Sequence, residues 1–288
     1  MKKAPSRPRP ISASLRNILA ITVLAISVAI MAAALTIPFS FESPSMFYKF
    51  GWDKILLRAG KMVGLAAALL VMLQLPLAGR VKWLDRIFSL PALYTAHRFV
   101  AYAIATLAIL HPVLVFLPDK ILMIPLESRY WPEWVGAGLL LVIVFQFGLS
   151  RWRHKVFKSY QTWLLLHRIM GVGAMALLAI HILFVSETFE HDGLPRNLVI
   201  ISAAMIMVLL LWIRMRGTLM RNWDYTIEQI TPAGENAYIV DLRSSTGQPL
   251  DYLPGQFAFL AFDSRRISKE PHPFTISSSP SRSGALQF

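Results

Sequence analysis

Two apolar stretches, YTAHRFVAYAIATLAILHPV at residues 94–113 and LLLHRIMGVGAMALLAIHIL at residues 164–183, decide the fold of this chain. Each carries two histidines fourteen positions apart, His97 with His111 and His167 with His181. In an α-helix of about 100° and 1.5 Å per residue, this spacing places both imidazoles nearly on one face, about 21 Å apart. Two such helices side by side predict two sites at different depths, each with one histidine from either helix.

The composition indicates an integral membrane protein that lies in a lipid bilayer. The 288 residues are 55% hydrophobic and only 16% charged, the mean hydropathy is +0.52, and the apolar residues form long runs. The formal net charge of +13 comes from Lys and Arg in short segments beside these runs, which is typical of orientation in a membrane and not of nucleic-acid binding. The absence of cysteine excludes disulfides, thiolate metal sites and a cysteine nucleophile.

Six segments are long enough to cross a bilayer, which takes about 20 apolar residues. They lie at roughly 15–37, 56–78, 91–117, 133–150, 161–185 and 196–216, and the fourth is the shortest. The first follows a basic arm at residues 1–14 and is too long for the core of a signal peptide, so we predict a retained span.

The distribution of Lys and Arg predicts the orientation of these spans. Basic residues gather in the N-terminal arm, in the second and fourth loops and after the sixth span, whereas the opposite loops hold most of the acidic residues. By the positive-inside rule, both termini are expected to be cytoplasmic, with the chain in the inner or plasma membrane of the cell. His97 and His167 then lie toward the cytoplasm, and His111 and His181 toward the outer face.

The composition changes after Asn222. YTIEQI, AYIVDLR and GQFAFLAF are typical of short strands, and TPAGEN and SSTGQP, which separate them, are rich in turn residues. We therefore predict a mainly α membrane fold, with a six-helix transmembrane bundle over residues 15–221 and a partial antiparallel β-barrel over residues 222–288. The final ALQF resembles the beginning of a further strand, so an unfinished barrel or a fragment is expected.

The paired histidines suggest redox chemistry. Polar side chains are costly inside a membrane, and four of the seven histidines lie in matched pairs within apolar spans. Two imidazoles fill both axial positions of a haem iron, so the pairs predict two b-type haems that carry electrons and do not bind oxygen. Alternatively, the imidazoles satisfy neighbouring polar groups, or line a water-filled path in a proton or metal-ion transporter.

Four basic side chains lie near the predicted sites. Arg98 and Arg168 directly follow the inner histidines, and either pair with haem propionates or extend to the membrane surface. Arg58 and Lys61 lie toward the outer end of the second span. They either pair with the propionates of the outer haem, attract an anionic substrate or contact lipid headgroups.

The C-terminal segment carries a further motif, HPFTISSSP at residues 272–280, preceded by PGQF at 254–257. It resembles the FAD-binding barrel of the ferredoxin-reductase type. Together with six spans that bear paired histidines, it resembles the ferric reductase and NADPH oxidase family of transmembrane flavocytochromes b. The resemblance implies contacts with the isoalloxazine and ribityl parts of FAD from His272, Pro273, Phe274 and Thr275, and places Ser277 and Ser278 near the phosphates.

The resemblance implies an oxidoreductase that passes electrons from cytoplasmic reduced FAD through the inner and then the outer haem to an external acceptor, such as a ferric chelate or oxygen. Family members continue with a nicotinamide-binding domain that takes NAD(P)H as the electron donor, and no Gly-x-Gly-x-x-Gly or P-loop pattern occurs in this chain. The chain is therefore expected not to be self-sufficient. Alternatively, it is a haem-bearing subunit whose β segment docks a separate reductase.

Overall fold

The computed structural model describes residues 11–42, 49–118, 124–185, 193–219, 223–235, 237–247, 250, 252–264, 272–279 and 285–288. The chain divides into two compact units, one formed by Ser12–Met215 and the other by Arg216–Phe288 with Met1–Ile11.

Within the described part of the chain, six helices are long and apolar enough to cross a membrane. They are α1 (Ala13–Ser40), α2 (Gly51–Ala78), α4 (Leu90–Phe116), α5 (Trp131–Arg151), α7 (Tyr160–Val185) and α9 (Leu194–Leu219). The six predicted spans are thereby confirmed. Most of these helices extend several residues past their apolar cores, since a helix needs no apolar residue to add another turn.

Short helices occupy three of the connections. They are α3 (Lys82–Phe88), the 3₁₀ turn η2 (Ser128–Tyr130) and α6 (Arg153–Val156). The first long helix begins with a side-chain cap, because the Leu15 amide donates a 3.3 Å hydrogen bond to the hydroxyl of Ser12.

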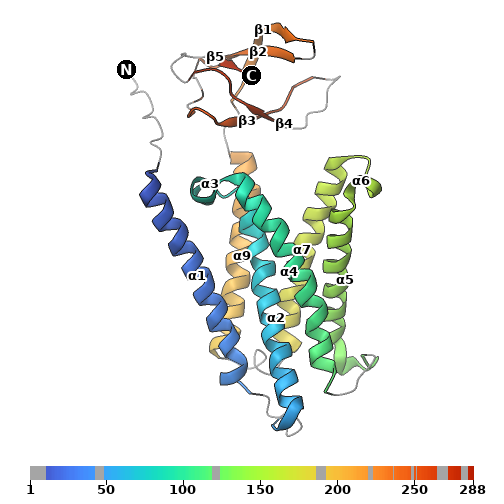
Figure 1. Cartoon of the computed structure of the whole chain (residues 1–288). Coiled ribbons are helices and arrows are strands. Elements are labelled where there is room, and N and C mark those ends of the chain that lie inside the picture. Colours follow the sequence, from blue (N-terminus) through green and yellow to red (C-terminus); the bar gives the residue numbers. More distant parts are fainter. Residues whose placement is uncertain are drawn as a thin grey trace. The chain divides into compact units, whose positions relative to one another are not determined.

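Two helix pairs form the centre of the bundle. α2 packs closely along α4, and α5 along α7 (Figure 1). Buried apolar residues of all four helices meet in one cluster, which comprises Ala68, Val71, Ile104, Leu139, Ala174, Leu178 and Ile182. Large apolar side chains elsewhere on the helices are exposed, as on α1, where Ile21 is 67% exposed. This distribution suits a bundle surrounded by lipid, in which outward-facing residues are as apolar as the core.

The C-terminal unit consists of antiparallel strands in two small sheets. β1 (Tyr225–Gly234), β2 (Ala237–Ser244) and β5 (Ala285–Gln287) form one sheet in the order β1-β2-β5. β3 (Phe257–Leu260) and β4 (His272–Thr275) form the other. The described strands form no closed barrel, which agrees with the predicted partial barrel and with the mainly α fold class.

One predicted turn is shorter in the structure. TPAGEN was expected to separate two strands, but β1 continues through Thr231 and Pro232 to Gly234. Proline lacks the N–H that a central strand would need, and β1 lies at the edge of its sheet, where that donor is dispensable. The pairing of β1 with β2 is irregular between Pro232 and Gly234, as expected of a bulge at such a position.

Candidate functional site

The four membrane histidines lie in two facing pairs between α4 and α7. The ring centres of His97 and His167 are 6.1 Å apart with an interplanar angle of 69°. Those of His111 and His181 are 6.3 Å apart with an angle of 82°. Two imidazoles that bind one metal ion from opposite sides have ring centres about 6 Å apart, because each metal–nitrogen bond is about 2 Å long and each nitrogen lies about 1 Å from its ring centre. The ring-centre distance of each pair therefore matches that of two imidazoles bound to one iron.

Main-chain carbonyls fix both rings of the outer pair. The Nδ1 atom of His111 donates to the carbonyl oxygen of Gly60 at 2.9 Å, and Nδ1 of His181 donates to that of Pro132 at 3.0 Å. A neutral imidazole with its proton on Nδ1 presents the lone pair of Nε2. The two hydrogen bonds thus set the tautomer that a metal ligand requires, as partners of metal-bound histidines generally do.

A glycine one turn further along each neighbouring helix makes these hydrogen bonds possible. A Cβ atom at Gly64 of α2 would lie 2.7 Å from Nδ1 of His111, and one at Gly136 of α5 would lie 2.7 Å from Nδ1 of His181. Both contacts are shorter than side chains tolerate, so each ring occupies the space that a side chain would fill. Here glycine serves a close approach between helices. The Gly-x-x-x-Gly pattern of Gly60 and Gly64, typical of close helix contacts, is the sequence signal that could have revealed one of these positions.

Glutamine side chains accompany the inner pair. Nε2 of Gln74 donates to the carbonyl oxygen of His97 at 3.2 Å. Nε2 of Gln146 lies 3.4 Å from the carbonyl oxygen of His167 and 3.3 Å from its Nδ1. The hydroxyl of Ser150 is also 3.3 Å from that Nδ1. None of these residues was predicted from sequence, because a single glutamine in an apolar helix carries no recognisable motif.

An aromatic ring stacks on one histidine of the inner pair, and a cationic side chain lies over that aromatic ring. The Trp163 ring stacks on the His167 ring, with centres 5.2 Å apart and an angle of 30°. The guanidinium of Arg153, on α6, lies over the Trp163 ring at 5.3 Å and over the ring of Tyr160 at 5.4 Å. Stacking and cation–π contacts of this kind hold an imidazole in one orientation. Trp163 therefore restricts the ring rotation of His167.

The number of protein ligands in each pair distinguishes between kinds of metal. Among the described residues, no group of three or more His, Cys, Asp or Glu side chains is arranged to hold a metal ion. A bare zinc or similar ion takes three or four protein ligands. Haem supplies four nitrogen atoms itself and needs only two axial ligands, so the donor set of each pair fits a haem better than a free ion.

The two arginines beside the inner histidines are exposed. Arg98 follows His97, and Arg168 follows His167, and both side chains lie on the surface of the bundle. A contact with haem propionates and an extension to the membrane surface both remain predictions for these residues.

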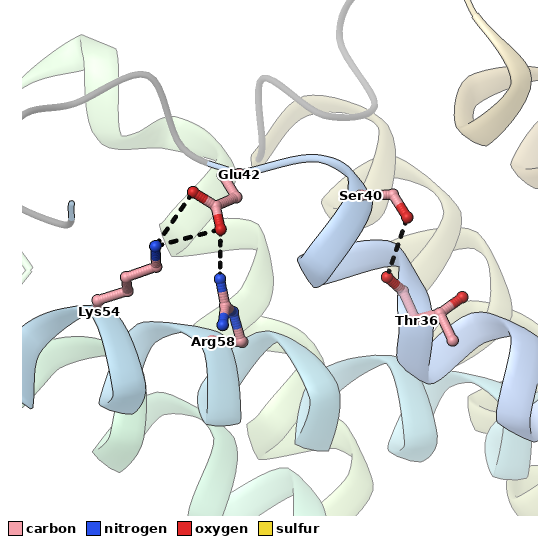
Figure 2. Close-up of polar contacts among 5 residues, drawn as sticks. All are labelled: Thr36, Ser40, Glu42, Lys54 and Arg58. Carbon is pink, nitrogen blue, oxygen red and sulfur yellow. Dashed lines mark hydrogen bonds and ion pairs between the residues drawn. The ribbon is translucent and has the colours of Figure 1, made fainter. Parts of the chain in front are cut away.

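The ends of α1 and α2 are joined by a charged cluster, formed by Glu42, Lys54 and Arg58 (Figure 2). A Glu42 carboxylate oxygen lies 2.5 Å from Arg58 Nη2 and 3.2 Å from Lys54 Nζ. The Arg58 guanidinium also lies 4.5 Å from the centre of the Phe39 ring. Arg58 therefore has a protein partner within the described chain. The hydrogen bond from Lys54 and the charges of Lys54 and Arg58 lower the pKa of Glu42 below its ordinary value of 4.5.

The E42Q variant tests this cluster. A carboxyl with a lowered pKa stabilises the fold above pH 4.5, and that stabilisation is lost as the pH falls through the lowered value. Because the pair is exposed, we expect E42Q to lower the thermal unfolding midpoint at pH 7 by no more than about 4 °C. The difference between wild type and E42Q should decrease as the pH falls below 4.5 and disappear once the pH is below the lowered pKa. A difference that does not change with pH would assign the effect to something other than charge.

The residues predicted to contact flavin lie on one short strand and the turn after it. His272, Pro273, Phe274 and Thr275 form β4, which pairs with β3, and all four side chains are exposed. Ser277 follows after the end of β4, and its amide donates to the carbonyl of Gln287 at 2.8 Å. The hydroxyl of Ser278 accepts from the Gln287 amide at 3.0 Å and contacts the Tyr252 hydroxyl at 2.8 Å.

The flavin-motif residues differ in how accessible their side chains are. The exposed face of β4 leaves the Thr275 hydroxyl and the Phe274 ring accessible, whereas the Ser278 hydroxyl takes part in the hydrogen bonds of the small sheet. Flavin contact by these residues stays a prediction.

Comparison with known families agrees with the helical part of the chain. Residues 63–178 match a family described as ferric reductase like transmembrane component. The match includes His97, His111 and His167 and ends three residues before His181. No curated protein matches the chain. This part of the helical bundle is therefore similar to ferric reductase-like transmembrane domains, and the general activity that the similarity indicates is that of an oxidoreductase.

Proposed function

We propose that this chain transfers single electrons across a membrane, from reduced FAD on the cytoplasmic side to an acceptor on the outer side. The path is formed by two b-type haems, an inner one bound by His97 and His167 and an outer one bound by His111 and His181. A ferric chelate or oxygen is the proposed acceptor. The observation that carries the proposal is the pair of facing imidazoles at two depths, each with the separation that one iron requires.

Each residue of the site has a task in this function. When bound, reduced FAD would supply two electrons and each haem would supply a one-electron Fe(III)/Fe(II) couple, so one reduced flavin would support reduction of two ferric chelates. The carbonyls of Gly60 and Pro132 hold the protons of the outer histidines on Nδ1 and leave Nε2 for iron. Gly64 and Gly136 leave the space in which the outer rings lie. The surrounding apolar cluster excludes water from the path between the pairs.

The cytoplasmic end of the path rests on sequence resemblance. His272, Pro273, Phe274 and Thr275 are proposed to contact the flavin ring system, and Ser277 and Ser278 its phosphates. The positive-inside distribution of Lys and Arg supports a cytoplasmic position for this segment and for both termini. Reduction of FAD by NAD(P)H is assigned to a nucleotide-binding domain or a separate reductase.

The spectrum of the purified protein tests the proposal. We expect a reduced-minus-oxidised difference spectrum of low-spin b-type haem and, by pyridine haemochrome assay, two haems per chain, one for each histidine pair. Binding of FAD to the same preparation, followed by flavin fluorescence, tests the β segment independently. A protein purified from haem-replete cells without any b-type haem would overturn the electron-transfer function.

Two other classes give different results. A haem-bearing subunit for a separate reductase would show the same haem spectrum but would not bind FAD, and would be reduced only after the reductase is added. A proton or metal-ion transporter would be active in a haem-free preparation. The two-ligand sites disfavour the metal transporter, because they offer a bare ion too few protein donors.

A further inference from the structure

The two central helix pairs are matched in sequence register. Gly60, Gly64 and Gln74 of α2 each lie 72 positions before a residue of α5 that occupies the same place, namely Pro132, Gly136 and Gln146. The histidines of α4 lie 70 positions before those of α7. In both pairs a main-chain carbonyl accepts from the outer histidine, a glycine lies beneath its ring, and a glutamine meets the inner histidine. A role for one glutamine therefore applies to its counterpart.

The inner and outer histidines are held by different kinds of group. Main-chain carbonyls of helices, whose positions the helix itself fixes, accept from the outer Nδ1 atoms. The inner histidines instead meet the side-chain amides of Gln74 and Gln146. A side-chain amide can turn, and it can present either an oxygen acceptor or an N–H donor to the imidazole.

His97 and Gln74, which are in contact, each carry a polar atom without a hydrogen-bond partner in the described part of the chain. In the described part of the chain, Nδ1 of His97 and Oε1 of Gln74 are buried without a hydrogen-bond partner, although Nε2 of the same glutamine donates to the His97 carbonyl. An imidazole that binds iron through Nε2 carries its proton on Nδ1 and needs an acceptor there. Oε1 of Gln74 is such an acceptor, carried by a side chain that already contacts the same residue.

The second inner histidine has an additional acceptor. Ser150 reaches Nδ1 of His167, whereas the equivalent position on α2 is Ala78. Trp163, stacked on His167, likewise corresponds to Leu93 on α4. His167 thus has several groups that contact its ring, whereas Gln74 contacts His97 at its main-chain carbonyl.

We propose that Gln74 and Gln146 are positioning residues that orient the two inner histidines and set the reduction potential of the inner haem independently of the outer one. This inference rests on the proposed function. An acceptor at Nδ1–H makes the imidazole a stronger electron donor to iron, which favours the ferric state and lowers the potential. For His97 the proposed acceptor is Oε1 of Gln74, whereas His167 also has the Ser150 hydroxyl near its Nδ1, so Gln74 has the larger influence of the two.

Redox titration of leucine variants tests this inference. In Q74L we expect the ferrous-to-ferric ratio of the inner haem at a fixed potential to rise about tenfold, equivalent to about 59 mV for one electron. In Q146L the shift in the midpoint of the inner haem should be smaller, and the double variant Q146L/S150A should show a larger shift than Q146L alone. The outer haem should keep its midpoint, and haem content should stay at two per chain. Q161L is the matched control, because it makes the same chemical change at an exposed position of α7.

The inner signal is assigned by repeating the titration in the H111A/H181A background, which lacks the outer ligands. Selective loss of the inner haem in Q74L would also support positioning. Should the leucine variants not accumulate in membranes, Q74M and Q146M, of similar length and without an amide, are expected to give the same shifts. Inner and outer midpoints that match those of Q161L would overturn this inference alone, whereas a haem-free wild-type protein would overturn the proposed function as well.

Discussion

The H111A/H181A variant is expected to retain one haem per chain and to lose transmembrane electron transfer. These two rings face each other with centres 6.3 Å apart, and their other nitrogens are held by the carbonyls of Gly60 and Pro132. Removal of both leaves iron no axial ligand at this depth, and the inner pair, about 21 Å away along the helix, is unaffected. H97A/H167A should show the reverse, with the outer haem retained.

Electron transfer should fall by at least about 100-fold in either double variant, since a misplacement of reacting groups by about 1 Å already has an effect of that size. The rate is measured in vesicles that enclose reduced flavin and face a membrane-impermeant ferric chelate outside. H154A is the control, because His154 lies on the short helix α6 and is exposed. Full haem content in both double variants would exclude these histidines as haem ligands.

The pattern of residues in the sequence was sufficient to predict the membrane spans and the pairing of the histidines. Hydropathy depends on composition over about 20 residues, and the fourteen-residue spacing lies within single helices, so neither requires knowledge of how helices pack. The partners of the histidines come from α2 and α5 and could not be predicted in this way. In lipid, residues that face the bundle are as apolar as those that face outward, so the rotation of a helix leaves little trace in its sequence.

Arg58 illustrates the same limit for charged residues. Its place near the end of a span was evident, but its partner, Glu42, lies beyond the end of α1 and is brought close only by the packing of α1 against α2. A side chain of either sign near a membrane surface has several possible partners, and sequence does not rank them. The contacts of Gly64 and Gly136 were equally hard to predict, because a glycine in an apolar helix is compatible with many packing roles.

Alanine substitutions at Gly136 and Gly138 distinguish an effect on helix stability from an effect on the histidine site. In G136A, the added Cβ would lie 2.7 Å from Nδ1 of His181. At Gly138, two positions further along the same helix and on nearly its opposite face, nothing lies within 4 Å of an added Cβ. Alanine favours a helix over glycine by about 1 kcal/mol at either position. Both variants thus gain the same helix propensity, and only G136A displaces a histidine ring.

We expect G136A to weaken binding of the outer haem about 10- to 100-fold, while G138A retains wild-type content. An overpacked contact costs about 1–3 kcal/mol, and loss of a hydrogen bond that orients a metal-bound histidine has a similar effect on affinity. Haem per chain and the low-spin fraction in the difference spectrum give the result, with the inner haem as an internal reference. G64A, beneath His111 on the matched helix, should behave like G136A. Equal haem content in G136A and G138A would mean that the His181 ring moves without loss, and that the hydrogen bond to the Pro132 carbonyl is dispensable for iron binding.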